Sequence, residues 1–377
     1  MGAVEALYKI KTAGHPNQDL SENNMASCHW PWLYGRCQGG NTMLAASYLV
    51  NLVRPAPLVY QLAGAVPEPS DKYSPTTHTS TLCTDMTRPA PLLRVHNFRW
   101  IAGDTASMKQ AVYAYGPMVT AFYWTSAKYN TSTGIYYYPK CPYSSNHEVL
   151  IVGWNDNMAH PGGKGCWIVK NSWGATWGKA GYFYIPYGTG AVGSDNLSYV
   201  SFTPYKANEN LYMEDRPGMV SAMGWGATTA SGAIVFQAPH LQETLQAVEF
   251  FTSSNNAQYE IKVWGTVTQS GNNVSFAGLL RSQTGVCQEM GYYSIPLTAA
   301  IPLTGGKNYA ITVKFTTPGY NYPLPIAYAY PGIIDKGWLG NGTALSYGQG
   351  NASVPFSRIV LGGPTPVAIC IRARTSY

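Results

Sequence analysis

Residues 146–186 carry the pattern that most restricts what this chain can fold into. A polar, turn-forming stretch ends at His147, which opens the apolar run Val149–Trp154. A second apolar run, Cys166–Asn171, ends on an amide side chain, and a third follows at Tyr182–Ile185. Short apolar runs between turn residues are typical of buried strands. If the first two strands are neighbours, the imidazole of His147 and the amide oxygen of Asn171 meet at one edge of a sheet.

The residues around these two positions follow the spacing of a known family. Asn-His-x-Val-x-x-Val-Gly-Trp begins at Asn146, and Trp-Ile-Val-Lys-Asn-Ser-Trp-Gly-x-x-Trp-Gly-x-x-Gly-Tyr begins at Trp167. This joint pattern resembles the papain-like cysteine peptidases. The resemblance implies that His147 is the catalytic acid and base, that Asn171 orients its ring, and that Trp173 covers the hydrogen bond between them. A lone histidine at a strand start is more often structural, so the joint spacing decides.

Two glycines and one glutamate are the candidate substrate-binding residues. Asp19–Glu22 and the run Gly-Arg-Cys-Gln-Gly-Gly at 35–40 resemble the family's N-terminal segment. The resemblance implies that the backbone of Gly39 and Gly40 lines the cleft, and a simple Gly-Gly turn before a helix is the local alternative. Glu148 stands where the family commonly has a small apolar residue. Two roles are open for Glu148. It either selects a basic side chain at the second substrate residue upstream of the cut, or it is a strand residue that faces solvent.

The cysteines favour scattered disulfides over a metal site, because the chain has no Cys-x-x-Cys or Cys/His ligand spacing. The family resemblance implies a bridge between Cys28 and Cys83. Cys166 lies in an apolar run and is expected to be a buried free thiol. Cys287 and Cys370 could bridge within the C-terminal half.

The nucleophilic cysteine of the family is expected outside this sequence. Ala3–Leu7 resembles the family's helix just after the nucleophile, which places that cysteine about six residues ahead of Met1. Cys28 is followed by a histidine but occupies the position of a structural disulfide, and the resemblance provides no partner for Cys37 or Cys141. Either Met1 is an internal methionine, or the chain is a remnant without catalysis. The complete histidine site favours the first, an endopeptidase; the alternative is an inactive protein that binds peptides or glycans.

The amino-acid composition restricts the classes of molecule that the protein is expected to bind. Charged residues form 11% of the chain, and the net charge of +6 includes no Lys/Arg cluster, so we expect no nucleic-acid partner. No apolar run reaches the roughly 18 residues of a membrane helix. A protein or peptide substrate is expected, with no metal and no other cofactor. The polar, charge-poor composition favours an extracellular or cell-surface protein, whose signal, if any, lies upstream of Met1.

Three parts are expected along the chain: a papain-like domain at 1–203, a polar linker at 204–218 and a second domain at 219–377. Helices followed by strands in the first part predict an α+β fold with a helical lobe and a β-barrel lobe. Beyond the linker, short runs such as Gln246–Phe251 and Tyr309–Phe315 predict an all-β sandwich. This part resembles the lectin-like domain of some bacterial and archaeal surface peptidases, which implies a carbohydrate or cell-surface ligand.

Overall fold

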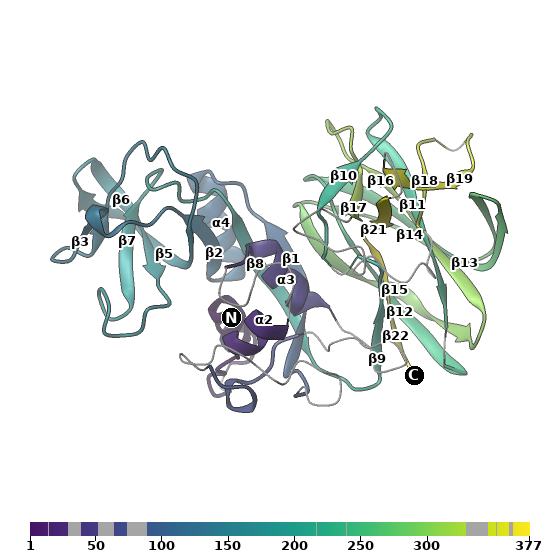
Figure 1. Ribbon diagram of the computed structural model, residues 1–377, viewed down its shortest axis with the longest axis horizontal. Helices are drawn as coiled ribbons and strands as arrows, with labels where there is room; N and C mark the ends of the chain where they lie inside the picture. The colour runs from purple at the N-terminus through teal and green to yellow at the C-terminus, as the bar shows by residue number, and fades with distance from the viewer. Residues whose placement is uncertain are drawn as a thin grey trace. The chain divides into compact units, whose positions relative to one another are not determined.

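A computed structural model describes residues 1–13, 15–28, 39–51, 64–73, 89–215, 217–238, 240–328, 346–351, 353–361 and 365–377. The chain forms two compact units, whose helices and strands are labelled in Figure 1. Unit 1 comprises Met1–Leu20 and Phe98–Phe202, and unit 2 comprises Ser21–Asn97 and Thr203–Tyr377. Within the described residues, no helix is long and apolar enough to cross a membrane.

Unit 1 places two helices on a sheet whose described strands pair antiparallel, except for the parallel pair β4 and β7. The helices are α1 (Gly2–Lys11) and α4 (Thr105–Tyr115), with a short 3₁₀ turn, η2 (Ser126–Lys128). The strands are β2 (Met118–Phe122), β3 (Tyr129–Asn130), β4 (Ile135–Tyr136), β5 (His147–His160), β6 (Gly163–Lys170), β7 (Tyr182–Pro186) and β8 (Asn196–Pro204), whose last two residues belong to unit 2. Their order in the sheet is β3-β4-β7-β6-β5-β2-β8.

Local signals explain why α4 and its neighbouring strands form. The side chain of Asp104 caps α4 by accepting from the backbone N–H of Ser107 at 2.9 Å, and the helix stops at Gly116, whose φ is 93°. The helix packs on β2 and β5. Apolar side chains that alternate along β5 and β6, such as Ile151 and Trp167, are buried in the same core as Met108 of α4.

Unit 2 begins with helices and ends as a strand-rich body. Its helices are α2 (Glu22–Cys28), α3 (Thr42–Val50) and the 3₁₀ turn η1 (Glu68–Ser70). Asn41 caps α3 through a hydrogen bond from the N–H of Leu44 at 2.9 Å, in the role that asparagine commonly has at a helix start. The strand β1 (Leu93–Trp100) follows, and within it the chain passes from unit 2 into unit 1.

The remaining strands of unit 2 form sheets around one core. Beside β1 run β15 (Gly291–Thr304), β12 (Gln242–Phe251), β22 (Ile371–Ser376) and β9 (Glu209–Tyr212), in that order. A second sheet has the order β10 (Ser221–Met223), β17 (Leu324–Tyr328), β21 (Thr365–Ile369) and β20 (Val360–Leu361). A third closes on itself in the order β11 (Thr229–Gln237), β16 (Asn308–Thr316), β13 (Ala257–Ser270), β14 (Asn273–Cys287), β19 (Phe356–Arg358) and β18 (Ser346–Gln349).

The core of unit 2 joins these sheets face to face. Phe250 of β12, Phe315 of β16 and Ile369 of β21 are fully buried in one apolar cluster. The rings of Phe250 and Phe315 meet edge to face, with centroids 5.2 Å apart. The predicted α+β class with a β-rich C-terminal half is therefore confirmed, with one layer of the sandwich closed into a barrel.

A buried group of charged residues in unit 2, which we term the arginine cluster, consists of Arg94, Asp215, Glu249, Arg372 and Arg374. Arg94 Nη2 lies 2.9 Å from Glu249 Oε1, and Arg374 Nε lies 3.0 Å from the same oxygen. Arg372 Nε lies 2.9 Å from Asp215 Oδ1. Isolated buried charges are costly, so their mutual pairing is what allows them to stay ionised.

The structure adds to the sequence expectations at two places in unit 2. Within the segment predicted as a polar linker, Glu209–Tyr212 form β9, because they pair with the C-terminal strand β22. The bridge that Cys287 and Cys370 could have made does not form, since Cys370 is a free, buried thiol. Its thiol hydrogen-bonds to Asp215, and burial together with that carboxylate raises its pKa well above the usual value. Spacing along the chain could not reveal that polar partner.

Candidate active site

His147 is held at the first position of β5. It pairs with Phe122, the last residue of β2. The preceding residue, Asn146, fixes this start, since its backbone N–H donates to the carbonyl of Phe122 at 3.0 Å. The Asn146 side chain also bonds both backbone groups of Trp124, accepting at 2.7 Å and donating at 3.1 Å. The imidazole therefore projects from a fully hydrogen-bonded corner between two strands.

Asn171 follows the last residue of β6 and turns back toward that imidazole. Because β5 and β6 are antiparallel neighbours, the start of one lies beside the end of the other. The Oδ1 atom of Asn171 lies 2.9 Å from Nε2 of His147. Oδ1 also accepts from the N–H of Ser172 at 2.9 Å, and the residue is only 6% exposed. The amide oxygen is an acceptor, so Nε2 carries the proton and Nδ1 is left for another partner.

Trp173 covers this hydrogen bond. Its indole stacks on the imidazole of His147 with centroids 5.0 Å apart and an interplanar angle of 18°. Trp124 and Trp177 in turn meet Trp173 edge to face at 5.0 Å and 4.9 Å. Phe122 lies 5.6 Å from the imidazole. An apolar surround of this kind excludes water and strengthens the hydrogen bond inside it.

The arrangement suits proton transfer to and from a sulfur nucleophile. The Asn171 amide is neutral, so it orients the imidazole of His147 without cancelling the positive charge that forms when the ring is protonated. A protonated imidazole stabilises a neighbouring thiolate, and the same ring can later return its proton to a leaving group. The sequence did not identify two sets of contacts around His147. These are the hydrogen bonds of Asn146 and the packing of Trp124 against Trp173. Asn146, the polar residue directly before His147, was the sequence feature that could have indicated these contacts.

The predicted substrate-binding residues lie in both units. Glu148 of β5 is exposed and pairs with Ala121 of β2. It interacts electrostatically with the buried Tyr199, whose pKa is raised by burial first and by this carboxylate second. Gly39 and Gly40 belong to unit 2, just ahead of α3, and the φ of 90° at Gly39 is a conformation that favours glycine. Their roles toward a substrate stay predictions.

The cysteines differ in whether their sulfur is free and accessible to react. Cys28 is disulfide-bonded, which removes it as a nucleophile, and its expected partner Cys83 lies outside the described residues, as does Cys37. Cys166 is the buried free thiol that the sequence predicts, and burial raises its pKa to about 11. Cys141 is free and partly exposed, and its Sγ donates to the carbonyl of Tyr143 at 3.8 Å.

Comparison with known proteins decides the family. The sequence model described as papain family cysteine protease matches residues 1–201, which include the whole His147 site. The chain belongs to the papain family of cysteine proteases. A second model, described as a lectin like domain, matches residues 211–374. The expected combination of a papain-like segment and a lectin-like segment is therefore confirmed.

Three animal proteins that resemble the chain each match about half of it. The chain is 26% identical over 213 residues to a gut-specific cysteine proteinase of Caenorhabditis elegans, a match over 52% of this chain and 62% of that protein. It is 28% identical to cathepsin Q of Rattus norvegicus, over 49% of each protein. For human cathepsin O the identity is 27%, over 53% of this chain and 57% of the relative. The chain thus spans about half to three fifths of these relatives.

Solved structures share the fold of the whole chain. The cysteine protease and lectin-like domains of Cwp84, a surface layer associated protein of Clostridium difficile, superpose with a TM-score of 0.78 at 23% identity. That match covers 100% of this chain and 82% of the other. Cwp84 after propeptide cleavage gives a TM-score of 0.80, again at 23% identity, over 99% of this chain and 92% of that one. Both parts of the papain-family chain therefore adopt a known combined fold.

Proposed function

We propose that this protein is a cysteine-type endopeptidase, a hydrolase that cleaves peptide bonds, with its thiolate supplied by residues that precede Met1. The observation that supports this most strongly is the 2.9 Å contact between His147 Nε2 and Asn171 Oδ1 under the indole of Trp173. It leaves Nδ1 of the imidazole as the atom that faces the reaction. Within this proposal His147 and Asn171 are catalytic and positioning residues, and Trp173 supports them.

The reaction proceeds in two halves. The thiolate attacks the carbonyl carbon of the peptide bond, and the carbonyl electron pair moves to oxygen. When that oxyanion collapses, the carbon–nitrogen bond breaks, and His147 gives its proton to the leaving amine. The neutral imidazole then takes a proton from water, whose oxygen attacks the acyl-enzyme. The carbon–sulfur bond breaks, the carboxylic product leaves, and the thiolate and protonated imidazole are restored.

Expression of the chain together with the residues encoded ahead of Met1 tests this proposal. We expect hydrolysis of peptide substrates and loss of roughly a hundredfold to ten-thousandfold in kcat/KM for His147→Ala. His160→Ala is the matched control, because His160 lies at the far end of the same strand. Peptide binding without hydrolysis by the extended protein would favour the alternative, an inactive peptide- or glycan-binding remnant.

Substrate selection is proposed to involve Gly39, Gly40 and Glu148. The two glycines offer backbone groups to an extended peptide, since no heavy atom of the described residues lies within 4 Å of the site where a Cβ would stand on either. The carboxylate of Glu148 favours a basic side chain at the second residue upstream of the cut. A peptide series that varies only this residue of the substrate, assayed as kcat/KM, tests the choice.

For the remainder of the chain we propose an extracellular or cell-surface setting in which the lectin-like part binds carbohydrate. The match of 211–374 to a lectin like domain supports the binding role, and the shared fold with a surface layer associated protein supports the location. We also propose domain bounds of 1–203 and 219–377, with 204–218 between them, and a bridge between Cys28 and Cys83. Binding of the purified chain to a printed glycan array tests the carbohydrate role. Retention on no glycan at all would exclude it.

A further inference from the structure

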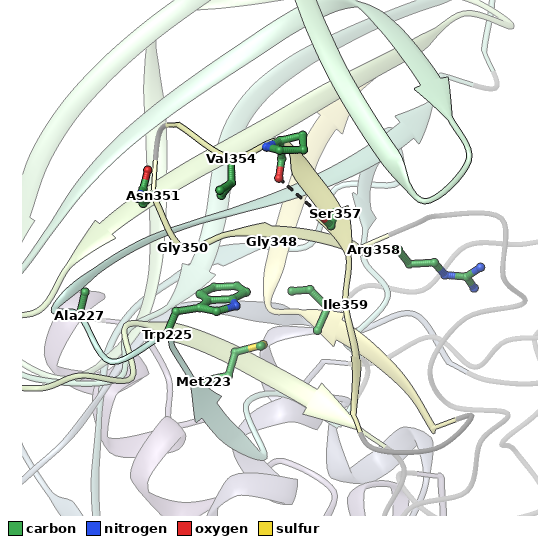
Figure 2. A pocket seen from close by; sticks show the side chains of 11 residues that line it. Met223, Trp225, Ala227, Gly348, Gly350, Asn351, Val354, Ser357, Arg358 and Ile359 are labelled. Atoms are coloured by element: carbon green, nitrogen blue, oxygen red, sulfur yellow. Dashed lines mark hydrogen bonds between the residues drawn. The ribbon is translucent and has the colours of Figure 1, made fainter.

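We propose that the pocket around Trp225 in unit 2 is a binding site for a neutral pyranose sugar, with the indole as its stacking platform. This inference deepens the carbohydrate-binding role proposed above and rests on it. The pocket is about 610 Å³, within the range of small-molecule sites, and Figure 2 shows the side chains that line it. They come from the turn between β10 and β11 and from the segment of β18 and β19.

Trp225 is an exposed indole that the proposed peptidase site does not use. It is 48% exposed, and among the described residues Trp173 is the only other exposed tryptophan. Trp173 already covers His147. Removing an indole from water is favourable in free energy. A ligand that covers this half-exposed ring would therefore gain binding energy.

Two glycines hold this indole flat. A Cβ at Gly350 would stand 2.9 Å from Cγ of Trp225, and a Cβ at Gly348 would stand 2.7 Å from its Cη2. Cγ and Cη2 lie at opposite ends of the indole, so the ring lies lengthwise along β18 with the glycine backbone beneath it. Gly348 and Gly350 are two residues apart and therefore present the same face of the strand. One face of the ring is packed on backbone, and its exposed area is left for a ligand.

The lining of the pocket identifies the chemistry of that ligand. Met223 and Ile359 lie beside the indole, and Asn351 and Ser357 add polar groups at the rim. Asn351 is fixed through its Oδ1, which accepts from the N–H and the hydroxyl of Ser353 at 2.6 Å and 2.5 Å. Its amide nitrogen is thereby available to donate to a hydroxyl group. The site thus combines a flat apolar surface with hydrogen-bonding groups at its edge.

A pyranose ring matches this combination. Its axial C–H bonds form an apolar face that is weakly positive and is attracted to the negative face of an aromatic ring, while its hydroxyls reach outward. Arg358 is the charged residue of the lining, and Figure 2 shows its guanidinium pointing away from the indole. Among the described residues of the lining, a phosphate or carboxylate over Trp225 would therefore lack a facing cation. A purely apolar ligand would leave the polar rim without partners.

Titration of the ¹⁵N-labelled chain with methyl hexopyranosides, followed through the tryptophan Nε1–H signals, tests the site. The panel is the methyl glycosides of glucose, galactose, mannose and N-acetylglucosamine. We expect at least one sugar to shift the signal that disappears in Trp225→Ala. We also expect Trp225→Ala to weaken that binding by about tenfold or more, as loss of an aromatic stacking surface does for other ring ligands.

Gly350→Ala provides a second variant that keeps the indole but displaces it, because the new methyl group would overlap the ring. It should weaken the same sugar while the Trp225 signal remains visible. Tyr113→Ala is the control, since this tyrosine is 82% exposed on α4 in the other unit, and it should bind as the parent does. Sugar binding that survives both pocket variants would overturn the site but leave the proposed carbohydrate role intact. Binding of no panel sugar to the parent chain, together with a blank glycan array, would overturn both.

Discussion

Replacing Glu249 by glutamine should destabilise unit 2 strongly. The carboxylate is fully buried and accepts from Arg94 at 2.9 and 3.3 Å, from Ser294 at 2.8 Å and from the hydroxyl of Tyr292, and it forms an ion pair with Arg374 at 3.0 Å. Burial alone would raise the pKa of Glu249, but the positive charges of Arg94 and its neighbours outweigh burial and hold the pKa well below its usual range.

The expected loss of stability comes from the buried arginine that loses its carboxylate partner. A glutamine keeps the shape but removes the charge, so Arg94 stays buried without its anion, whereas Arg374 keeps a second carboxylate partner in Glu209 at 3.5 Å. Removing one partner of a buried ion pair typically costs about 3–5 kcal/mol. A double variant, Arg94→Leu with Glu249→Leu, also removes the stranded cation at Arg94. It should therefore be less destabilised than the sum of the two single variants.

Urea unfolding together with native-state hydrogen exchange measures this loss. Glu260→Gln is the matched control, because Glu260 pairs with Lys262 and Lys314 in the same unit but its side chain is 23% exposed. We expect that control to lose less than about 1 kcal/mol. Peptides from β1 and β12 should lose protection together in Glu249→Gln, since Arg94 and Glu249 join these strands. A loss no larger than that of Glu260→Gln would refute this reasoning.

Three other changes have defined outcomes. Burial and then the charge of Arg94 lower the pKa of His96 from 6.5 to about 3, so between these values the unfolded chain binds the extra proton. Stability therefore falls as pH drops through this range, by up to about 1.4 kcal/mol per unit, and His96→Gln should flatten the slope in urea unfolding. In the extended enzyme, Glu148→Gln should lower the kcat/KM ratio of Arg over Phe peptides, and an unchanged ratio would leave Glu148 a solvent-facing residue. Asn171→Ala should lower kcat/KM roughly tenfold to a hundredfold at unchanged folding, as expected for a lost hydrogen bond to a charged group.

The sequence predicts best where one local signal dominates. The apolar runs after His147 become β5 and β6, and residues that commonly cap or end helices do so here, Asn41 ahead of α3 and Gly116 after α4. Each of these depends on a neighbour a few residues away. The contact between His147 and Asn171 could be anticipated for the same reason, since it follows from two adjacent antiparallel strands and their ends.

The features that the sequence did not predict depend on residues that lie far away along the chain. The sequence does not predict β1, because Arg94 and His96 give it a polar appearance, and the partners that make their burial tolerable, such as Glu249 for Arg94 and Thr203 for His96, lie far along the chain. β9 looked like a linker because its partner is the last strand of the chain. The free thiol of Cys370 was missed in the same way, since Asp215 holds it and no spacing indicates that contact. Pairings across more than a hundred residues are decided by packing, and local periodicity carries no information about them.

The most direct test is to treat the native protein, purified from the organism that makes it, with a biotinylated peptidyl epoxide and to locate the adduct by mass spectrometry. We expect one inhibitor per molecule, bound to a cysteine that precedes Met1, and no adduct after the substrate cleft is filled with a competing peptide aldehyde. A folded native protein that takes up no inhibitor, or one that is modified only at Cys141, would contradict a papain-type thiolate acting with His147 and Asn171.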